Sequence, residues 1–558
     1  MSLHCRPVDP LPEETARVAR AAFPAGHPYL HLADELGTLF TDDLFAGVYP
    51  KHGQPAFVPW RLALVTILQF AEGLSDRRAA DAVRSRIDWT YVLRLELTDP
   101  GFDASVLSEF RTRLLDGQAE RLLLDRLLDW CRGRRLLKTR GRQRTDSTHV
   151  LAQVRALNRL EVVGETMCHA LDALAVIAPD WLRTRSQPDW ADRYGRRVED
   201  GRLPTGKEAR EARAVAIGTD GYALLGAVYA PDAPAWLRTL PAVDTLRRVW
   251  VQNYFYIADA DGGRAAWRAD DAIPPASRFI SSPHDGDAHD ARKGSTQWVG
   301  YRIHVTETCE DATPCLVTQV ETTPGPVADG EATPTIHANL RRRDLLPGTH
   351  IVDTGYLDAT LLVASREGYG VELLGPARPD NHRQARAGEG YSAEHFRIDW
   401  DARQATCPQG RTSISWTPAV DKGRTDVIKI KFSATDCRAC VHRDHCVHSR
   451  RTSVGRALTV RPQAQYEALQ AARQRTQTPE FVALYARRAG IEGTISRGVR
   501  TCRLRRTRYI GRARTHLGHV LTGVGLNVLR LGEWLAGIPR ATTRRSHFSQ
   551  LTARPLPT

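Results

Sequence analysis

Apolar residues recur at helical spacing along the first part of the chain. Between positions 59 and 72 they fall every three to four residues on two faces, which predicts a helix that is buried on most of its surface. Gly73 ends this segment, and Ser75 is placed to cap a second helix across 76–87. The short break between them is compatible with a helix-turn-helix and equally with a plain helical bundle. We therefore expect residues 1–135 to form a helical domain.

The pattern changes to a β-type one near residue 141. The string RTDSTHVLAQV is rich in β-branched residues and predicts a strand that carries Asp146. A helical stretch follows from 156 to about 178. Residues 298–306 and 315–322 are typical of paired strands, and a short apolar strand ends at Asp353. The middle of the chain therefore predicts an α/β domain with a helical insertion.

The last third of the chain contains a polar segment and then a long helical one. Residues 380–465 favour β-structure and contain several cysteines, and residues 462–535 favour helices, with Thr478 and Pro479 placed to begin one of them. No apolar run approaches the roughly 18 residues that would span a bilayer. The first residues also lack the apolar core of a secretory signal, so we expect a cytoplasmic protein.

The charge of the chain is basic and unevenly distributed. The 558 residues include 78 Lys and Arg against 64 Asp and Glu, a net charge of +14, and an apolar fraction of 42% excludes a chain that is disordered throughout. Seven basic residues and no acid lie between Arg132 and Arg144, and ten Arg with a single acid, Glu492, lie between Arg487 and Arg514. One such run alone is typical of a solvated helix face. Two runs, each beside a candidate catalytic carboxylate, favour a nucleic-acid partner.

Three acids stand out by their context. Asp146 lies within a strand pattern that disfavours Asp, Asp353 lies at the end of an apolar strand, and Glu492 is alone in a basic helix. Taken singly, Asp353 could shape a turn and Asp146 could accept a local hydrogen bond. Together, two Asp on neighbouring strands and a Glu on a later helix would bring like charges to one point, which divalent cations would neutralise. Oxygen ligands suit Mg²⁺, and two such ions about 3.5–4 Å apart support phosphodiester displacement.

The same residues carry a resemblance to a known family. The strings RTDSTHV, WVGYRIHVTETC, HIVDTGYLD and ARRAGIEGTISRGVR resemble the DDE transposases of bacterial insertion sequences, specifically the family numbered eleven-eighty-two. The segment PWRLALVTILQFAEGLSDRRAADAVRSRIDW is similar to the N-terminal domain of that family. The resemblance covers roughly residues 30 to 535, with the strings in the family's order.

This resemblance implies an α/β fold with an RNase H-like core, a mixed sheet flanked by helices, with Asp146 on the first strand and Asp353 on the fourth. The long intervals between the three acids then require two insertions, one helical and one β-leaning and Cys-containing. The implied divisions are a helical N-terminal DNA-binding and assembly domain (1–135), the first core strand (136–154), a helical insertion (155–290), the continued core (291–379), a Cys-containing insertion (380–465), C-terminal core helices (466–535) and a tail (536–558).

The helix around Glu492 resembles the Tyr–Arg–Glu–Lys signature of related transposases. Tyr485, Arg488 and Glu492 are spaced by three and four residues and share one helical face. In those relatives the basic residues of the signature contact phosphates near the transposon end. The fourth position of the signature is Val499 here, so Arg497 and Arg500 are the alternative basic residues.

Further basic residues lie near the predicted strand pair. Arg292, Lys293 and Arg302 are candidates for holding the DNA backbone, with surface solvation as the equal alternative. Gly490 and Gly493 weaken the helix on both sides of Glu492 and allow a kink, a close approach of backbone to DNA, or a simple helix break.

Four cysteines lie within forty residues of one another. Cys407, Cys437, Cys440 and Cys446 are compatible with a tetrahedral structural zinc ion, and His442, His445 and His448 offer alternative ligands. A reduced, metal-free cluster is the equal alternative.

The sequence thus predicts a transposase that cleaves DNA at insertion-sequence ends and joins them to target DNA, with Asp146, Asp353 and Glu492 holding two Mg²⁺ ions, for which Mn²⁺ would substitute. The expected partners are double-stranded terminal inverted repeats and target DNA, bound by a homodimer associated with the nucleoid. The two alternatives are a metal-dependent nuclease without strand transfer and a DNA-binding remnant whose catalytic site has decayed.

Overall fold

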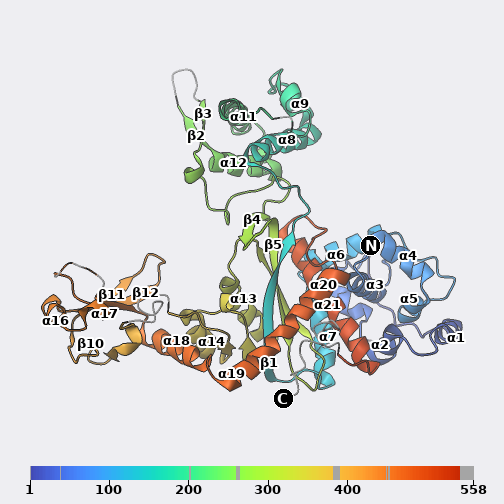
Figure 1. The fold of residues 1–558 in the computed structure, drawn as a ribbon. Helices are drawn as coiled ribbons and strands as arrows, with labels where there is room; N and C mark the ends of the chain where they lie inside the picture. Colours follow the sequence, from blue (N-terminus) through green and yellow to red (C-terminus); the bar gives the residue numbers. More distant parts are fainter. Residues whose placement is uncertain are drawn as a thin grey trace, which may run out of the picture. The chain divides into compact units, whose positions relative to one another are not determined.

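The computed structural model describes residues 2–37, 39–199, 201, 203–258, 264–380, 390–447, 449, 451 and 453–540. Of the expected tail, residues 541–558 lie outside this part of the chain. The chain divides into two compact units. Figure 1 draws their helices and strands, coloured along the sequence. The first comprises residues 1–137, 311–317 and 520–558, and the second comprises residues 138–310 and 318–519.

The first unit is helical, as its apolar spacing predicts. Eleven of the thirteen residues of α3 are buried, and the Ser75 hydroxyl accepts the Arg78 backbone N–H at the start of α4, which confirms the expected cap. Its N-terminal helices are α1 (Glu13–Ala22), α2 (Pro28–Leu36), α3 (Pro59–Ala71), α4 (Asp76–Ser85), α5 (Ile87–Val92), α6 (Ser105–Asp116) and α7 (Leu122–Gly133).

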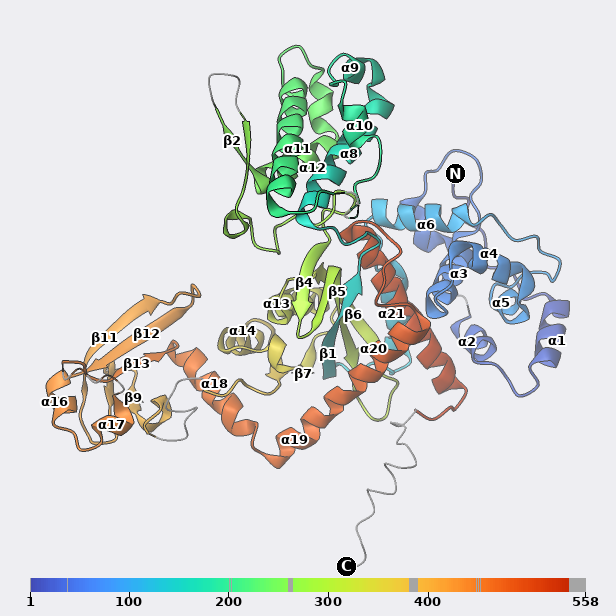
Figure 2. The same ribbon diagram turned by 45° about the horizontal axis from the view of Figure 1, so that its top comes forward.

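The second unit contains a six-stranded mixed sheet. Its strands are β1 (Arg140–Leu151), β4 (His289–Lys293), β5 (Thr296–Thr308), β6 (Val317–Pro324), β7 (Pro347–Ile351) and β8 (Glu372–Leu374). The order is β4–β5–β1–β7–β8, with β6 also paired to β5. Strand β5 is antiparallel to β1, whereas β7 is parallel both to β1 and to β8. The helices α13 (Asp329–Arg341), α14 (Ala359–Tyr369) and α20 (Gly490–Thr501) flank this sheet (Figure 2).

A helical segment is inserted between β1 and β4. It contains α8 (Arg159–Ile177), α9 (Pro179–Arg183), α10 (Trp190–Tyr194), α11 (Lys207–Val228), α12 (Pro241–Asn253), β2 (Tyr254–Ile257) and β3 (Arg264–Trp267). Helix α8 begins with a capping box in which Asn158 and Glu161 bond to each other's backbone. A core of its own, centred on Trp250 and Tyr254, holds the segment together.

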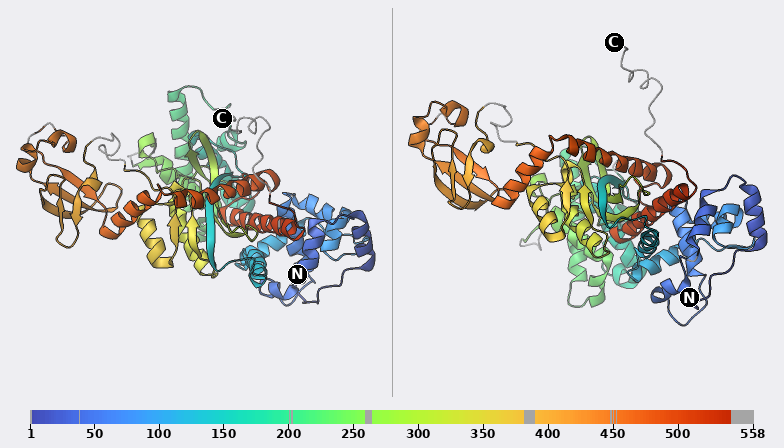
Figure 3. Two further views of the ribbon diagram at one scale, coloured as in Figure 1. Left: turned by 60° about the horizontal axis from the view of Figure 1, so that its bottom comes forward. Right: turned by 90° about the horizontal axis from the view of Figure 1, so that it is seen from below.

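A second insertion, after β8, is built from short strands and helices around a small core of Phe396, Ile430, Phe432 and Leu458. Its elements are β9 (Arg397–Asp399), β10 (Gln404–Thr406), β11 (Ser413–Val420), β12 (Asp426–Phe432), α16 (Ala434–Arg438), α17 (Arg443–Cys446) and β13 (Ala457–Val460). The chain then continues through α18 (Gln463–Arg475), α19 (Pro479–Tyr485), the 3₁₀ turn η7 (Ala486–Ala489), α20 and α21 (Arg512–Leu535) (Figure 3). The Thr478 hydroxyl accepts the Phe481 N–H, as expected for the cap of α19.

Across the described ranges, every helix is too short or too polar to cross a membrane.

Candidate active site

The three acids singled out in the sequence share one partner, the guanidinium of Arg488. Its Nη2 lies 2.8 Å from Asp146 Oδ2 and 3.9 Å from Asp353 Oδ2, and its Nη1 lies 3.3 Å from Glu492 Oε1. Asp146 comes from β1, Asp353 follows β7, and Glu492 comes from α20. The parallel pairing of β1 with β7 places the first two acids near one edge of the sheet, and α20 packs on β1. The structure therefore gathers the predicted triad around a half-buried cation.

Each aspartate also makes the local hydrogen bond that a purely structural role in a turn or strand would require. The Ser147 N–H donates to Asp146 Oδ1 at 2.8 Å, and the Gly355 N–H donates to Asp353 Oδ1 at 2.8 Å. In both residues the Oδ2 atom is the one that faces Arg488. Turn chemistry and a shared site are thus compatible, because one oxygen fixes the carboxylate and the other remains available for a cation.

Burial and charge act in opposite directions on these groups. Burial, and after it the charge of Asp353, raises the pKa of Asp146, against the lowering by Arg488 and Lys293. Burial alone would lower the pKa of Arg488, but Asp146, Tyr485, Asp353 and Glu492 together raise it above its ordinary value. The like-charged acids thus depend on a cation between them.

The donor set suits a divalent cation, although the side chains are not closed around one. Within the described ranges, no three His, Cys, Asp or Glu side chains are gathered closely enough to bind a metal ion as they stand. Carboxylate oxygens are the ligands that Mg²⁺ prefers. The Glu492 side chain is 66% exposed, and its Oε1 accepts a hydrogen bond from Arg488. The residues therefore fit a metal that would take the place of the guanidinium.

A second, fully buried ion pair holds α20 against the sheet. Arg144 Nη2 lies 2.6 Å from Glu307 Oε1, and the Thr494 hydroxyl donates to Glu307 Oε2 at 2.7 Å. Arg144 also donates to the backbone carbonyl of Arg487. A Cβ on Gly490 would overlap the Arg144 guanidinium, so the glycine permits this approach. These contacts fix the backbone next to Arg488 and Glu492, and Gly490 serves packing within the protein.

The other residues expected to contact DNA differ in how far they are exposed. The ring of Tyr485 stacks on Phe481 at 5.4 Å, and burial raises its pKa. Arg292 Nε donates to the Gly294 carbonyl and Arg500 Nε to the Ser496 carbonyl, both on exposed surface. Arg497 is half-buried near Cys502.

Lys293 is closer to the acids than its neighbour Arg292. Its Nζ lies 3.4 Å from Asp329 Oδ2, and its charge also acts on Asp146. Arg302, expected at the surface, is 9% exposed and lies 2.8 Å from Asp329 Oδ1. The alternative of surface solvation is therefore wrong for Arg302.

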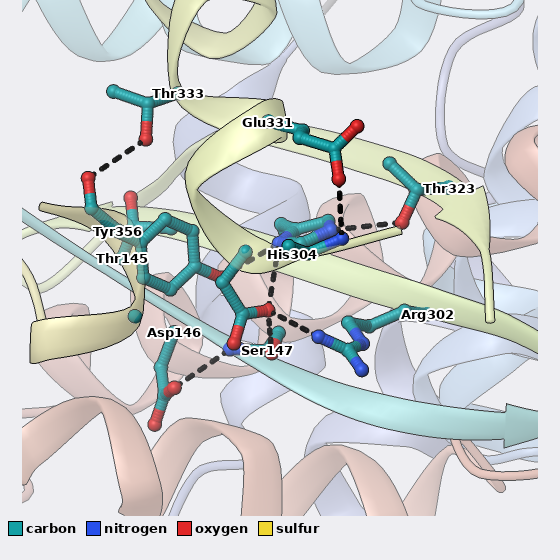
Figure 4. A network of polar contacts seen from close by, with 12 residues as sticks. Thr145, Asp146, Ser147, Arg302, His304, Thr323, Glu331, Thr333 and Tyr356 are labelled. Atoms are coloured by element: carbon teal, nitrogen blue, oxygen red, sulfur yellow. Dashed lines mark hydrogen bonds and ion pairs between the residues drawn. The ribbon is translucent and has the colours of Figure 1, made fainter. Parts of the chain in front are cut away.

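Asp329 is the residue of this region that sequence reasoning missed, and three of its neighbours, Ser147, Arg302 and His304, are labelled in Figure 4. The Ser147 hydroxyl donates to Asp329 Oδ1 at 2.7 Å, and His304 Nδ1 bonds the Tyr356 hydroxyl at 2.7 Å. Burial raises the pKa of Asp329, but Arg302, Ser147 and Lys293 outweigh it and lower that pKa overall. The one local signal was an acid at the first residue of a helix, which is ordinary at helix starts. Only the tertiary structure brings it beside Asp146.

The four grouped cysteines line one cavity of about 270 Å³, together with His442. Burial and the three neighbouring thiols raise the pKa of Cys446 to about 11, while Arg456 lowers it. The Arg411 N–H donates to Cys407 Sγ at 3.3 Å, and the Arg456 N–H donates to Cys437 Sγ at 3.4 Å. His448 lies outside the described residues. The thiols thus face a common space but are not closed around an ion.

Two family models match the chain. The model described as "Transposase DDE domain" matches residues 406–532, which include Arg488 and Glu492, and the model described as "Transposase domain (DUF772)" matches residues 17–113. These two matches support a DDE transposase of an insertion sequence. No curated protein and no solved structure matches it significantly.

A DDE transposase domain implies a DNA substrate and dependence on a divalent metal, typically Mg²⁺. The resemblance to the family numbered eleven-eighty-two stays a prediction.

Proposed function

We propose that this transposase cuts DNA at the ends of its element and joins the freed 3′-hydroxyl to target DNA in a single site made of Asp146, Asp353 and Glu492. The observation that carries the proposal is the convergence of these acids, 207 and 139 residues apart in the chain, on one guanidinium. An RNase H-like core is part of the proposal. In the order β4–β5–β1–β7–β8, with β6 also paired to β5, strand β5 is antiparallel to β1 while β1, β7 and β8 are parallel, which supports such a core.

The side chains of the proposed site would have separate roles. Asp146 and Asp353 present their Oδ2 atoms as ligands, because Oδ1 is engaged locally. Glu492 turns inward from α20. When bound, two Mg²⁺ ions, or Mn²⁺ in their place, would supply the Lewis acidity for phosphodiester displacement. Arg488, displaced from the acids, contacts a phosphate next to the reacting bond together with Tyr485.

Further basic side chains would follow the DNA away from the reacting bond. Arg497, Arg500, Arg292 and Lys293 are the proposed backbone contacts. The helical residues 1–135 and the helical insertion at 155–290 would recognise the terminal inverted repeats and assemble the complex. A homodimer is expected because two ends must be brought together. The basic charge of the chain supports an association with the nucleoid.

A structural zinc ion at Cys407, Cys437, Cys440 and Cys446 belongs to the same proposal. The common cavity and the two backbone N–H groups that donate to Cys407 and Cys437 support it. Because this segment, 380–465, has only a small apolar core, a bound ion would add to its stability.

A supercoiled-plasmid assay with Mg²⁺ and an element-end duplex tests the proposed activity. Strand joining supports a transposase with an intact site, nicking alone a nuclease, and binding without cleavage a decayed remnant. Asp353→Asn should abolish cleavage and leave end binding largely intact, because the substitution removes one ligand charge and keeps the hydrogen bond from Gly355. Cleavage that persists in this variant would overturn the assignment of Asp353.

A further inference from the structure

Asp329, the first residue of α13, lies beside Ser147 and Gly355, the residues that follow or adjoin the two aspartates of the proposed site. The Ser147 hydroxyl donates to Asp329, and the backbone N–H of the same serine donates to Asp146 Oδ1. A Cβ built on Gly355 would lie 3.2 Å from Asp329 Oδ2 and 3.0 Å from Asp353 Oδ1, so the two carboxylates flank the same glycine. Asp329 is therefore hydrogen-bonded to the serine that holds Asp146 and lies beside the glycine that holds Asp353.

Asp329 faces two cationic side chains and one neutral imidazole. Burial lowers the pKa of His304 to about 4, so this imidazole is neutral near pH 7 and does not balance Asp329. Two cations face the single carboxylate, Arg302 at 2.8 Å and Lys293 at 3.4 Å. Arg302 is buried, whereas the Lys293 side chain is 58% exposed. Lys293 is thus the one of the two cations that reaches solvent, and its charge acts on Asp146 as well as on Asp329.

We propose that Asp329 is a positioning residue of the transposase site, which orients Asp146 through Ser147 and holds the Lys293 ammonium beside the acids, ready to contact a DNA phosphate. The inference rests on the proposed function, because it assigns a role relative to the same acids. A carboxylate that orients a ligand from behind typically changes metal affinity or activity by about 10–100-fold when it is removed.

The test compares Asp329→Asn, Ser147→Ala and Lys293→Met with the wild-type protein. Ser147→Ala leaves every charge in place and removes only the hydroxyl between Asp329 and Asp146, so it isolates orientation from electrostatics. Asp358→Asn is the matched control, because Asp358 is an exposed helix-start aspartate whose hydrogen bond to the Leu361 N–H an Asn side chain retains. Thermal unfolding of each variant reports on folding separately.

The first readout is Mn²⁺ binding to the DNA-free protein by electron paramagnetic resonance. We expect a loss of affinity of about 10–100-fold for Asp329→Asn and about tenfold for Ser147→Ala, with Lys293→Met and Asp358→Asn not weakened. The second readout is binding of end DNA as a function of salt. Lys293→Met should lower the slope of log K against log salt by about one phosphate contact, because one counterion fewer is released.

Wild-type Mn²⁺ affinity in both Asp329→Asn and Ser147→Ala would overturn the positioning role, and an unchanged salt slope in Lys293→Met would overturn the phosphate contact. A wild-type protein that binds end DNA but does not cleave it would instead contradict the proposed function. The binding readouts decide the role of Asp329 in either case, so the two failures are distinguishable.

Discussion

The guanidinium of Arg488 is ion-paired with Asp146 at 2.8 Å and also lies 3.9 Å from Asp353 and 3.3 Å from Glu492. Arg488 occurs one turn before Glu492, so α20 and the preceding turn bring a cation and an acid to the same place. The cation stabilises three carboxylates that would otherwise repel one another. A divalent ion at the proposed site would therefore compete with a residue of the protein itself.

Replacing Arg488 should uncouple metal binding from catalysis. In Arg488→Ala the acids lose their internal counter-ion, so Mn²⁺ affinity of the DNA-free protein should rise, by about tenfold for each 1.4 kcal/mol of attraction removed. Cleavage of end DNA should fall at the same time, because the phosphate contact is lost. Calorimetric Mn²⁺ titration and a cleavage assay measure the two effects. Arg475→Ala, which removes an exposed arginine paired with Glu372, is the control. Unchanged or weaker Mn²⁺ binding in Arg488→Ala would contradict the competition.

The two glycines beside Glu492 should respond oppositely to alanine. A Cβ on Gly490 collides with an Arg144 guanidinium that Glu307 and the Arg487 carbonyl hold in place, so Gly490→Ala should destabilise the protein by about 1–3 kcal/mol and reduce cleavage. Gly493 faces open space within α20, and Gly493→Ala should stabilise the protein by about 0.5–1 kcal/mol. Thermal unfolding of the two variants measures the difference. Equal effects of both substitutions would show that Arg144 does not depend on the close approach.

The sequence allowed the prediction of features that depend on neighbours along the chain. The cap at Ser75 and the cap at Thr478 are confirmed, as is the strand around Asp146. The Arg144–Glu307 pair joins residues 163 positions apart, and the Ser147–Asp329 bond joins residues 182 apart. Such pairings depend on the register of β1 against β5 and on the approach of α13. No local pattern in the sequence encodes this register or the approach of α13. The sequence therefore does not indicate Asp329, and the prediction of a surface position for Arg302 is wrong.

The proposed zinc site predicts the metal content of the purified protein. Protein purified without chelator should carry about one zinc ion per chain by mass spectrometry, because four thiols line one cavity. The paired substitution Cys437→Ser and Cys440→Ser should remove the ion and lower the unfolding temperature. Cys5→Ser, which changes an exposed cysteine outside the cavity, is the control. Metal-free wild-type protein with four freely titratable thiols would favour the reduced cluster.

The buried imidazole of His519 should make stability depend on pH. Burial lowers its pKa to about 3, from an ordinary value near 6.5, and its Nδ1 bonds the Thr322 hydroxyl. Below about pH 6.5, the His519 imidazole therefore binds a proton in the unfolded chain but stays neutral in the folded protein. The stability associated with His519 is complete above this pH and is lost as the pH falls, by about 2 kcal/mol at pH 5.

His519→Gln should remove that share of the dependence. Urea unfolding at pH 7 and at pH 5, followed by tryptophan fluorescence, should show a smaller difference between the two conditions in His519→Gln than in the wild-type protein. The dependence should not vanish, because His304 and His337 are also buried with a pKa lowered to about 4. His52→Gln, which replaces an exposed histidine, should behave as wild type. If His519→Gln and wild type lose equal stability between pH 7 and pH 5, the imidazole of His519 is not held neutral by burial.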